Sequence, residues 1–246
     1  MSAAVSRTAN KVATIGFDAD DTLWESEAFF AVTEERFVAL LAPWCASADV
    51  TTALLSTERA NLHHFGYGVK GFTLSMIETA ISLTEGVIPA NALAEIIGWG
   101  REMMAHPVQL VDGVRDVLEQ LTPEFRLVLI TKGDLFHQES KVAESGLADL
   151  FSAVEILSEK DERSYQRVLD GLGIEAASFT MVGNSLRSDI EPVVAIGGRG
   201  VHIPHTITWA IEEGTAAFEP GHQWATLASI HDLPVHLAGR DQVDAP

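Results

Sequence analysis

The chain contains little of three things: cysteine, positive charge and uninterrupted apolar sequence. Cys45 is its one cysteine, so an intramolecular disulfide and a cysteine-rich metal site are both excluded. We interpret Cys45 as a small, half-buried helix residue, since no activating motif surrounds it. No apolar run approaches the roughly 20 residues that cross a bilayer. The first ten residues lack the apolar segment of a signal peptide, and we expect a cytoplasmic protein.

Positive charge is scarce across the whole chain. There are 16 Lys and Arg against 35 Asp and Glu, a formal net charge of −19. Nucleic acids and anionic membranes are bound through basic surfaces, so we expect neither as a partner. An anionic small molecule would have to be held by local positive charge. The sequence predicts no oligomeric state.

An apolar run near the N-terminus ends abruptly in carboxylates. Residues 12–17 are followed by Asp18, Asp20 and Asp21, with Thr22 behind them. A run that is apolar at nearly every position is typical of a strand buried on both faces of a parallel sheet. Open α/β sheets bind ligands at the carboxyl ends of such strands. The alternative is an ordinary turn whose acidic residues cap a helix.

The next 80 or so residues have helical periodicity and no convincing strand. Apolar residues recur at three- and four-residue steps, and Pro43, Gly66, Gly68 and Pro89 separate the segments. We therefore expect a compact helical unit inserted after the first strand. The predicted helices span about residues 29–41, 49–64, 71–83 and 89–104.

Strands and helices alternate beyond this insertion, which implies right-handed crossovers and a doubly wound parallel sheet. We expect an α/β core domain built from residues 1–23 and 108–246, and an all-helical cap domain at 24–107. The chain from Thr206 onward is weakly patterned, and we expect residues 239–246 to be frayed. The predicted strands are 126–131, 153–157, 179–183 and 200–203; the predicted helices are 113–121, 134–144, 162–172 and 188–196.

Polar residues follow each of the first four predicted strands. In a parallel sheet the carboxyl ends of the strands lie at one edge, so these residues should lie close together. Carboxylates gathered there repel one another unless a cation is present, and a few hard oxygen ligands suit Mg²⁺. The metal and a lysine would attract a phosphoryl group. The residues are Asp18 and Asp20, then Thr131 and Lys132, then Lys160, then Asn184, Ser185 and Asp189.

This ordered set resembles the haloacid dehalogenase-like hydrolase superfamily. The motifs cover the α/β portion, about two thirds of the chain. Each motif is weak by itself, and it is their order at successive strand ends that carries the resemblance. The motifs are Asp18-Ala19-Asp20-Asp21-Thr22, then Thr131, then Lys160, then Gly183-Asn184-Ser185 with Asp189.

The resemblance implies a Rossmann-like core with an inserted cap, and a Mg²⁺-dependent phosphatase of a small phosphorylated metabolite. Asp18 would be the nucleophile that forms an aspartyl-phosphate. Asp20 would protonate the leaving alcohol and then activate water. Ala19, Thr131, Lys132 and Lys160 would contact the phosphate, the second through its hydroxyl and the third through its backbone amide. Mg²⁺ would be held by Asp18, Asp20, Asn184 and Asp189.

Two positions depart from the usual family pattern. Asn184 stands where an Asp is usual, which removes one negative charge from the metal site. Asp21 stands where Gly is common, and we interpret it as a turn or helix-cap residue. Lys160 by itself is also typical of a solvated charge run. The side chains of Lys132 and Arg187 could face either the crevice or solvent.

Several other functions stay open. A carbon–halogen hydrolase needs the nucleophile but no acid for the leaving group, so the presence of Asp20 favours a phosphatase. A phosphonate hydrolase would need a cap lysine, and Lys70 is the only one. A phosphoacceptor switch domain is disfavoured by the early Asp18, and a catalytically weak phosphate-binding relative is kept open by Asn184. The candidates for substrate contact in the cap are Arg59, His63, Tyr67 and Lys70.

Overall fold

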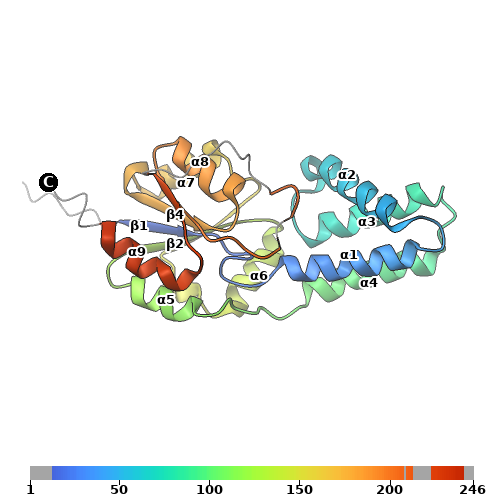
Figure 1. Cartoon of the computed structure of the whole chain (residues 1–246), viewed down its shortest axis with the longest axis horizontal. Helices are drawn as coiled ribbons and strands as arrows, with labels where there is room; N and C mark the ends of the chain where they lie inside the picture. The colour runs from blue at the N-terminus through green and yellow to red at the C-terminus, as the bar shows by residue number, and fades with distance from the viewer. Residues whose placement is uncertain (1–12, 208, 213–222, 241–246) are drawn as a thin grey trace, which may run out of the picture.

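The protein is a six-stranded parallel sheet joined to a bundle of four helices (Figure 1). This computed structural model describes residues 13–207, 209–212 and 223–240. The strand order is β3-β2-β1-β4-β5-β6, so the prediction of a doubly wound parallel sheet is confirmed. The strands are β1 Thr14–Phe17, β2 Arg126–Lys132, β3 Ala153–Leu157, β4 Phe179–Gly183, β5 Arg199–His202 and β6 Trp224–Thr226.

Helices cover both faces of the sheet. Side chains alternate along a strand, and in β2 Leu127 and Leu129 belong to one hydrophobic core while Val128 and Ile130 belong to another. The first core includes residues of α5, α6 and α9, and the second includes residues of α7 and α8 (Figure 1). The bounds are α5 Val114–Leu121, α6 Leu135–Ser145, α7 Glu162–Leu172, α8 Glu191–Ala195 and α9 Leu233–Arg240.

The four predicted helices of the insertion are present and pack around a hydrophobic core of their own. Phe37, Leu54, Met76 and Ile96 contribute to it, one from each helix, and all four are at most 1% exposed. The bundle extends from one end of the sheet (Figure 1). The helices are α1 Glu27–Leu41, α2 Ser47–Phe65, α3 Val69–Leu83 and α4 Ala90–Met104.

The two chain segments that enter and leave the insertion run side by side. Trp24 and Leu110 form an antiparallel bridge. The Glu25 amide donates to the Gln109 carbonyl at 2.9 Å, and the Val111 amide donates to the Leu23 carbonyl at 3.0 Å. The two connecting segments are therefore hydrogen-bonded to each other at the base of the helical bundle.

Residues 223–240 contain regular structure that their sequence pattern does not predict. The edge strand β6 and helix α9 were not expected, and the expectation of a frayed end is wrong for Gly239 and Arg240, which belong to α9. Residues 241–246 lie outside the described part. A three-residue strand is too short for alternation to be seen, and α9 has only eight residues. No helix among the described residues is long and apolar enough to cross a membrane.

The packing of α9 gives a stability prediction. Leu233 is fully buried in the core beneath the sheet, so Leu233→Ala should lower the free energy of unfolding by about 3 kcal/mol. Val235, in the same helix, is 79% exposed, and Val235→Ala should change it by less than about 0.5 kcal/mol. Urea unfolding of both variants measures the difference. Equal effects would contradict the placement of α9 on the core.

Candidate active site

The carboxyl ends of β1, β2, β3 and β4 deliver the predicted residues to a single pocket between the sheet edge and the helical insertion. Asp189 arrives on a π-helical turn, Leu186–Ile190, which precedes α8 and replaces the start of the helix predicted at 188. The predicted residues that line the pocket are Asp18, Asp20, Thr131, Lys132, Lys160, Asn184 and Asp189.

A buried lysine joins two of the carboxylates. The Lys160 ammonium forms an ion pair with Asp18 and donates to Asp189 Oδ1 at 2.7 Å, and the side chains of Lys160 and Asp189 are each 1% exposed. Burial alone would lower the pKa of Lys160, but the charges of Asp18 and Asp189 raise it well above its usual value. Burial raises the pKa of Asp18 to about 7, although Lys160 opposes this. Lys160 is therefore a permanent charge in the site.

Asp20 is held by three donors. Trp24 Nε1 and Lys141 Nζ donate to Oδ1 at 2.7 and 2.5 Å, and Gln138 Nε2 donates to Oδ2 at 2.7 Å. Burial would raise the pKa of Asp20, but Lys141, Gln138 and Trp24 together hold it below the usual value. Gln138 and Lys141 are not predicted from the sequence. They are three residues apart and so share one face of α6, but nothing in the sequence directs that face to β1.

A carboxylate oxygen of Asp18 and the amide oxygen of Asn184 lie close together in the pocket. The Thr22 hydroxyl donates to Asp18 Oδ2 at 3.0 Å, and Asn184 Oδ1 lies 3.4 Å from the same hydroxyl oxygen, so these two oxygens face a common point. Asp189 differs, because its oxygens already accept from Lys160 Nζ and from the Ser185 amide at 3.0 Å. Oxygen ligands of this kind fit Mg²⁺. Asn184 is better placed than Asp189 to offer a free oxygen.

The absence of a side chain at Gly183 leaves room for the Asp189 carboxylate beside the end of β4. A Cβ atom at position 183 would lie 2.2 Å from Asp189 Oδ2, far closer than atoms in contact. Any larger residue would displace the Asp189 carboxylate, and Lys160 would lose one partner. The glycine of the fourth motif thus has a steric reason.

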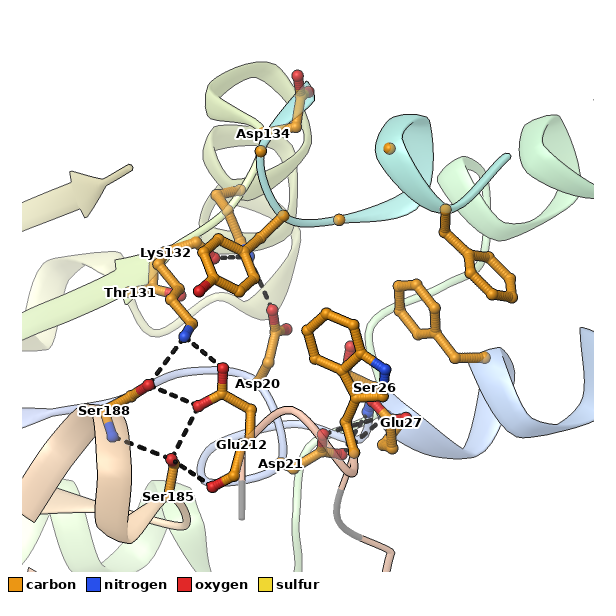
Figure 2. A pocket seen from close by; sticks show the side chains of 18 of the residues that line it. Asp20, Asp21, Ser26, Glu27, Thr131, Lys132, Asp134, Ser185, Ser188 and Glu212 are labelled. Atoms are coloured by element: carbon orange, nitrogen blue, oxygen red, sulfur yellow. Dashed lines mark hydrogen bonds and ion pairs between the residues drawn. The ribbon is translucent and has the colours of Figure 1, made fainter. Parts of the chain in front are cut away.

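Asp21 caps a helix, as predicted. Its Oδ1 accepts from the Ser26 amide at 2.8 Å and from the Glu27 amide at 3.0 Å, at the start of α1 (Figure 2). Its φ of 60° lies in the left-handed region, where Asp is tolerated. Asp21 therefore joins the end of β1 to the first helix of the insertion.

The Lys132 side chain lies in the crevice, which the sequence left open. Its ammonium contacts Glu212 Oε1 at 2.5 Å and Ser188 Oγ at 2.8 Å, and lies 4.0 Å from the centre of the Tyr67 ring (Figure 2). Glu212 was missed, because it belongs to a segment without regular structure. Arg187 holds that segment by donating to the Ile211 carbonyl at 2.5 Å.

The remaining residues that the sequence suggested for contact with a ligand differ in their distance from the pocket. Tyr67 lines the pocket, and its hydroxyl donates to Glu159 at 2.7 Å. Lys70 forms an ion pair with Asp134 at 2.9 Å, and Arg59 and His63 are exposed on α2. None of these last three is among the described residues that line the pocket. The Ala19 side chain is fully buried, so only its backbone is available to a ligand.

A second group of metal-binding residue types lies beside the site. Among the described residues, Asp21, Glu25 and His205 are the one set of His and carboxylate groups whose ligand atoms lie within 4.8 Å of one another. Asp21 already caps α1, and His205 Nε2 contacts Glu25 Oε2 at 3.1 Å. These three residues are not the predicted metal ligands, whose carboxylates contact lysines.

The insertion contributes acidic residues to the pocket. Burial raises the pKa of Glu27 to about 8, and the charges of Asp21 and Glu58 add to the effect. Burial likewise raises the pKa of Glu58 to about 7, with a further increase from Glu34. These carboxylates are costly to ionise in the free protein.

Comparison with known proteins shows the family of the chain. Residues 12–197 match the sequence model of the haloacid dehalogenase-like hydrolases. The chain is 27% identical to the N-acylneuraminate-9-phosphatase of Mus musculus over 190 residues, 73% of each chain. It is similar to the structure of a haloacid dehalogenase-like family hydrolase from Xanthomonas campestris, with 44% identity and a TM-score of 0.84 over 96% and 94% of the two chains. The L-2-haloacid dehalogenase of Xanthobacter autotrophicus, at 16% identity and a TM-score of 0.66 over 93% and 99%, shares the fold.

The raised pKa of Glu27 predicts a pH-dependent cost to stability. Between pH 4.5 and about 8 the unfolded chain ionises Glu27 while the folded protein keeps its proton, so stability falls as the pH rises through this window. Glu27→Gln removes that cost. Because water screens part of the effect at this half-buried position, its stabilisation should grow by about 1 kcal/mol between about pH 5.5 and about pH 8.5.

Urea unfolding in metal-free buffer at both pH values measures the change. Glu35→Gln is the matched control, because Glu35 is exposed on the same helix. A stabilisation by Glu27→Gln that is the same at both pH values would contradict the prediction.

Proposed function

The chain belongs to the haloacid dehalogenase-like hydrolases, and we propose that within this family it is a Mg²⁺-dependent phosphatase of a small phosphorylated metabolite. The observation that carries the proposal is Asp20, a second carboxylate in the same pocket as Asp18 and held there by three donors. Hydrolysis of a phosphate ester needs a group that gives a proton to the leaving alcohol and then takes one from water.

Positive charge on the sheet side of the pocket supports phosphate binding. Lys160 stays charged between Asp18 and Asp189 and would neutralise charge between the nucleophile and the phosphate. Thr131, 1% exposed at the end of β2, would give its hydroxyl, and Lys132 its backbone amide. Such fixed donors stabilise the charge that develops during phosphoryl transfer.

In the first step, an oxygen of the Asp18 carboxylate attacks phosphorus and the bond from phosphorus to the alcohol oxygen breaks. Asp20 gives its proton to the departing oxygen, so the products are a free alcohol and an aspartyl-phosphate. Asp20 must first be protonated. The negative charge of a bound phosphate raises the pKa of a neighbouring carboxyl, which favours that protonation.

In the second step, Asp20 removes a proton from a water molecule whose oxygen attacks phosphorus. The bond from phosphorus to Asp18 breaks, inorganic phosphate is released, and the Asp18 carboxylate is restored. The contacts from Lys141, Gln138 and Trp24 stabilise ionised Asp20, the form that acts as the base.

Mg²⁺ would be held by the Asp18 carboxylate, the Asp20 backbone carbonyl and the Asn184 side-chain oxygen, with Asp189 in support. The oxygens of Asp18 and Asn184 that face Thr22 support this assignment. When bound, the metal supplies positive charge that offsets the carboxylates and the phosphate oxygens.

The helical insertion, residues 24–107, would act as the cap. It forms one wall of the pocket and is joined to the core by two paired segments at Leu23–Glu25 and Gln109–Val111. Closure over the substrate would exclude water before the first step. The similarity to N-acylneuraminate-9-phosphatases, across 73% of each chain, also supports a phosphomonoester as substrate.

Displacement of a halide is the second candidate function, and one observation favours it. Lys141 holds Asp20 ionised, and an ionised carboxylate is no acid, whereas a halide leaves without a proton. In that reaction Asp18 would attack carbon instead of phosphorus. A phosphonate hydrolase has less support, because Lys70 is paired with Asp134 instead of facing the pocket.

Loss of either proposed catalytic carboxylate should lower the phosphatase activity. Asp18→Asn should lower Mg²⁺-dependent turnover of p-nitrophenyl phosphate by about a thousandfold or more. Asp20→Asn should lower it by about a hundredfold or more, because proton transfer is lost. Asp149→Asn, at an exposed position outside the pocket, serves as the control.

Phosphate release and chloride release from 2-chloropropionate are measured in parallel. Absence of turnover with every phosphate ester tried would refute the phosphatase. Chloride release that survives Asp20→Asn would establish the halide reaction instead.

The metal assignment gives a separate prediction. Asn184→Asp adds a negative charge at the proposed site, so it should lower the Mg²⁺ concentration that gives half-maximal activity by about tenfold. Asn91→Asp adds the same charge at an exposed position of α4 and should leave that concentration unchanged. A Mg²⁺ titration of activity compares them. An unaltered requirement in Asn184→Asp would contradict the role of Asn184.

A further inference from the structure

The pocket has lysines on one side and glutamates on the other. The sheet side and α6 supply three lysines, Lys132, Lys141 and Lys160. The helical insertion supplies three glutamates: Glu27 and Glu34 from α1 and Glu58 from α2. Among the described residues of the insertion that line the pocket there is no Lys, Arg or His.

Each lysine is already paired with a carboxylate of the core, whereas the glutamates have no cationic partner among the described residues. Lys160 is paired with Asp18, Lys141 with Asp20 and Lys132 with Glu212. Within the described part of the chain, the carboxylates of Glu27 and Glu34 receive no hydrogen bond and no ion pair, and Glu58 is hydrogen-bonded by the Trp209 side chain. The insertion therefore presents carboxyl groups without a cationic partner to the pocket, and a cation bound beside them would favour their ionised form.

The three glutamates form a track that leads outward from the catalytic edge. Burial raises the pKa of Glu27 most, and the charges of Asp21, Glu58 and Asp20 raise it further; burial also raises the pKa of Glu58, and the charge of Glu34 adds to it. Each group is thus close enough to the next to interact. A half-buried carboxylate is relieved by a cation at hydrogen-bond distance, whereas an anionic ligand increases the repulsion.

Aromatic rings lie around this track. Phe30 and Phe72 stand edge to face with ring centres 5.2 Å apart, and Tyr67 and Trp209 do so at 6.1 Å. All four line the pocket. Ring faces attract cations, most strongly where water is excluded. Carboxylates and rings together favour an organic ammonium group over a hydrated metal ion, because the rings offer no ligand atoms.

We propose that the alcohol part of the substrate carries an amine, which sits as an ammonium group against Glu27 and Glu58 while the phosphate sits on the sheet side. This rests on the proposed phosphatase function and deepens it. The substrate class is a small phosphate monoester with a protonated amine at its other end. Its phosphate would face the lysines, and its ammonium group would face the glutamates, which it would hold in their ionised form.

Matched aryl phosphates test this class directly. Tyramine O-phosphate ends in an ammonium group, tyrosol O-phosphate has a hydroxyl in its place, and 3-(4-phosphonooxyphenyl)propanoate has a carboxylate. Two methylene groups insulate the phenol in each, so the leaving groups are similar in reactivity. With Mg²⁺ present, kcat/KM for the ammonium ester should exceed that for the hydroxyl ester by about tenfold, and the carboxylate ester should be the poorest.

The variants test the residues. Glu27→Gln and Glu58→Gln should each lower the ratio of kcat/KM for the ammonium ester to that for the hydroxyl ester, towards unity. Glu35→Gln, exposed on α1, should keep the wild-type ratio. Both substrates are compared on one preparation, so partial unfolding of a variant does not alter the ratio. If Glu58→Gln fails to fold, Glu27→Gln alone decides.

The outcomes are distinct. Equal or inverted kcat/KM values for the ammonium and hydroxyl esters would overturn the amine proposal and leave the phosphatase standing. A preference for the ammonium ester that neither glutamine variant reduces would overturn the assignment to Glu27 and Glu58. No hydrolysis of any aryl phosphate, p-nitrophenyl phosphate included, would overturn the proposed function and the amine proposal with it.

Discussion

The buried ion pairs of Lys160 with Asp18 and Asp189 are the interaction on which the site depends. Two carboxylates removed from water beside each other are unstable without a cation, and removal of one partner from such a cluster commonly costs several kcal/mol. The three residues follow three different strands. Their contact therefore requires the order β3-β2-β1-β4 and the steric gap left by Gly183.

Charge within the pocket is arranged against the charge of the whole protein. A net charge of −19 repels a phosphate, yet three lysines line the sheet side of the crevice. Each is held by carboxylates of the core, so the local charge is fixed in place before a ligand arrives. Glu27 and Glu58 of the insertion have no cationic partner among the described residues, and burial raises the pKa of both. Stability is commonly given up at sites of function in this way.

Most of the sheet could be predicted from apolar, β-branched runs, because a strand buried on both faces has few alternatives in composition. The strands 153–157 and 179–183 have the predicted bounds, and Asp21 has the predicted role as a helix cap. The C-terminal elements could not be predicted. β6 is stabilised by pairing with β5 and α9 by packing on α5, and neither contact leaves a periodic signal in so short a segment.

The residues at the strand ends follow from the sequence alone, since a parallel sheet brings those ends to one edge whatever the details of packing. The presence of Asp18, Thr131, Lys160 and Asp189 in one crevice follows in the same way. The partners of each charge, in contrast, follow from the packing of the folded chain. Lys141 reaches Asp20 from a helix and Glu212 reaches Lys132 from an irregular segment, because these contacts depend on how separate elements are oriented in space.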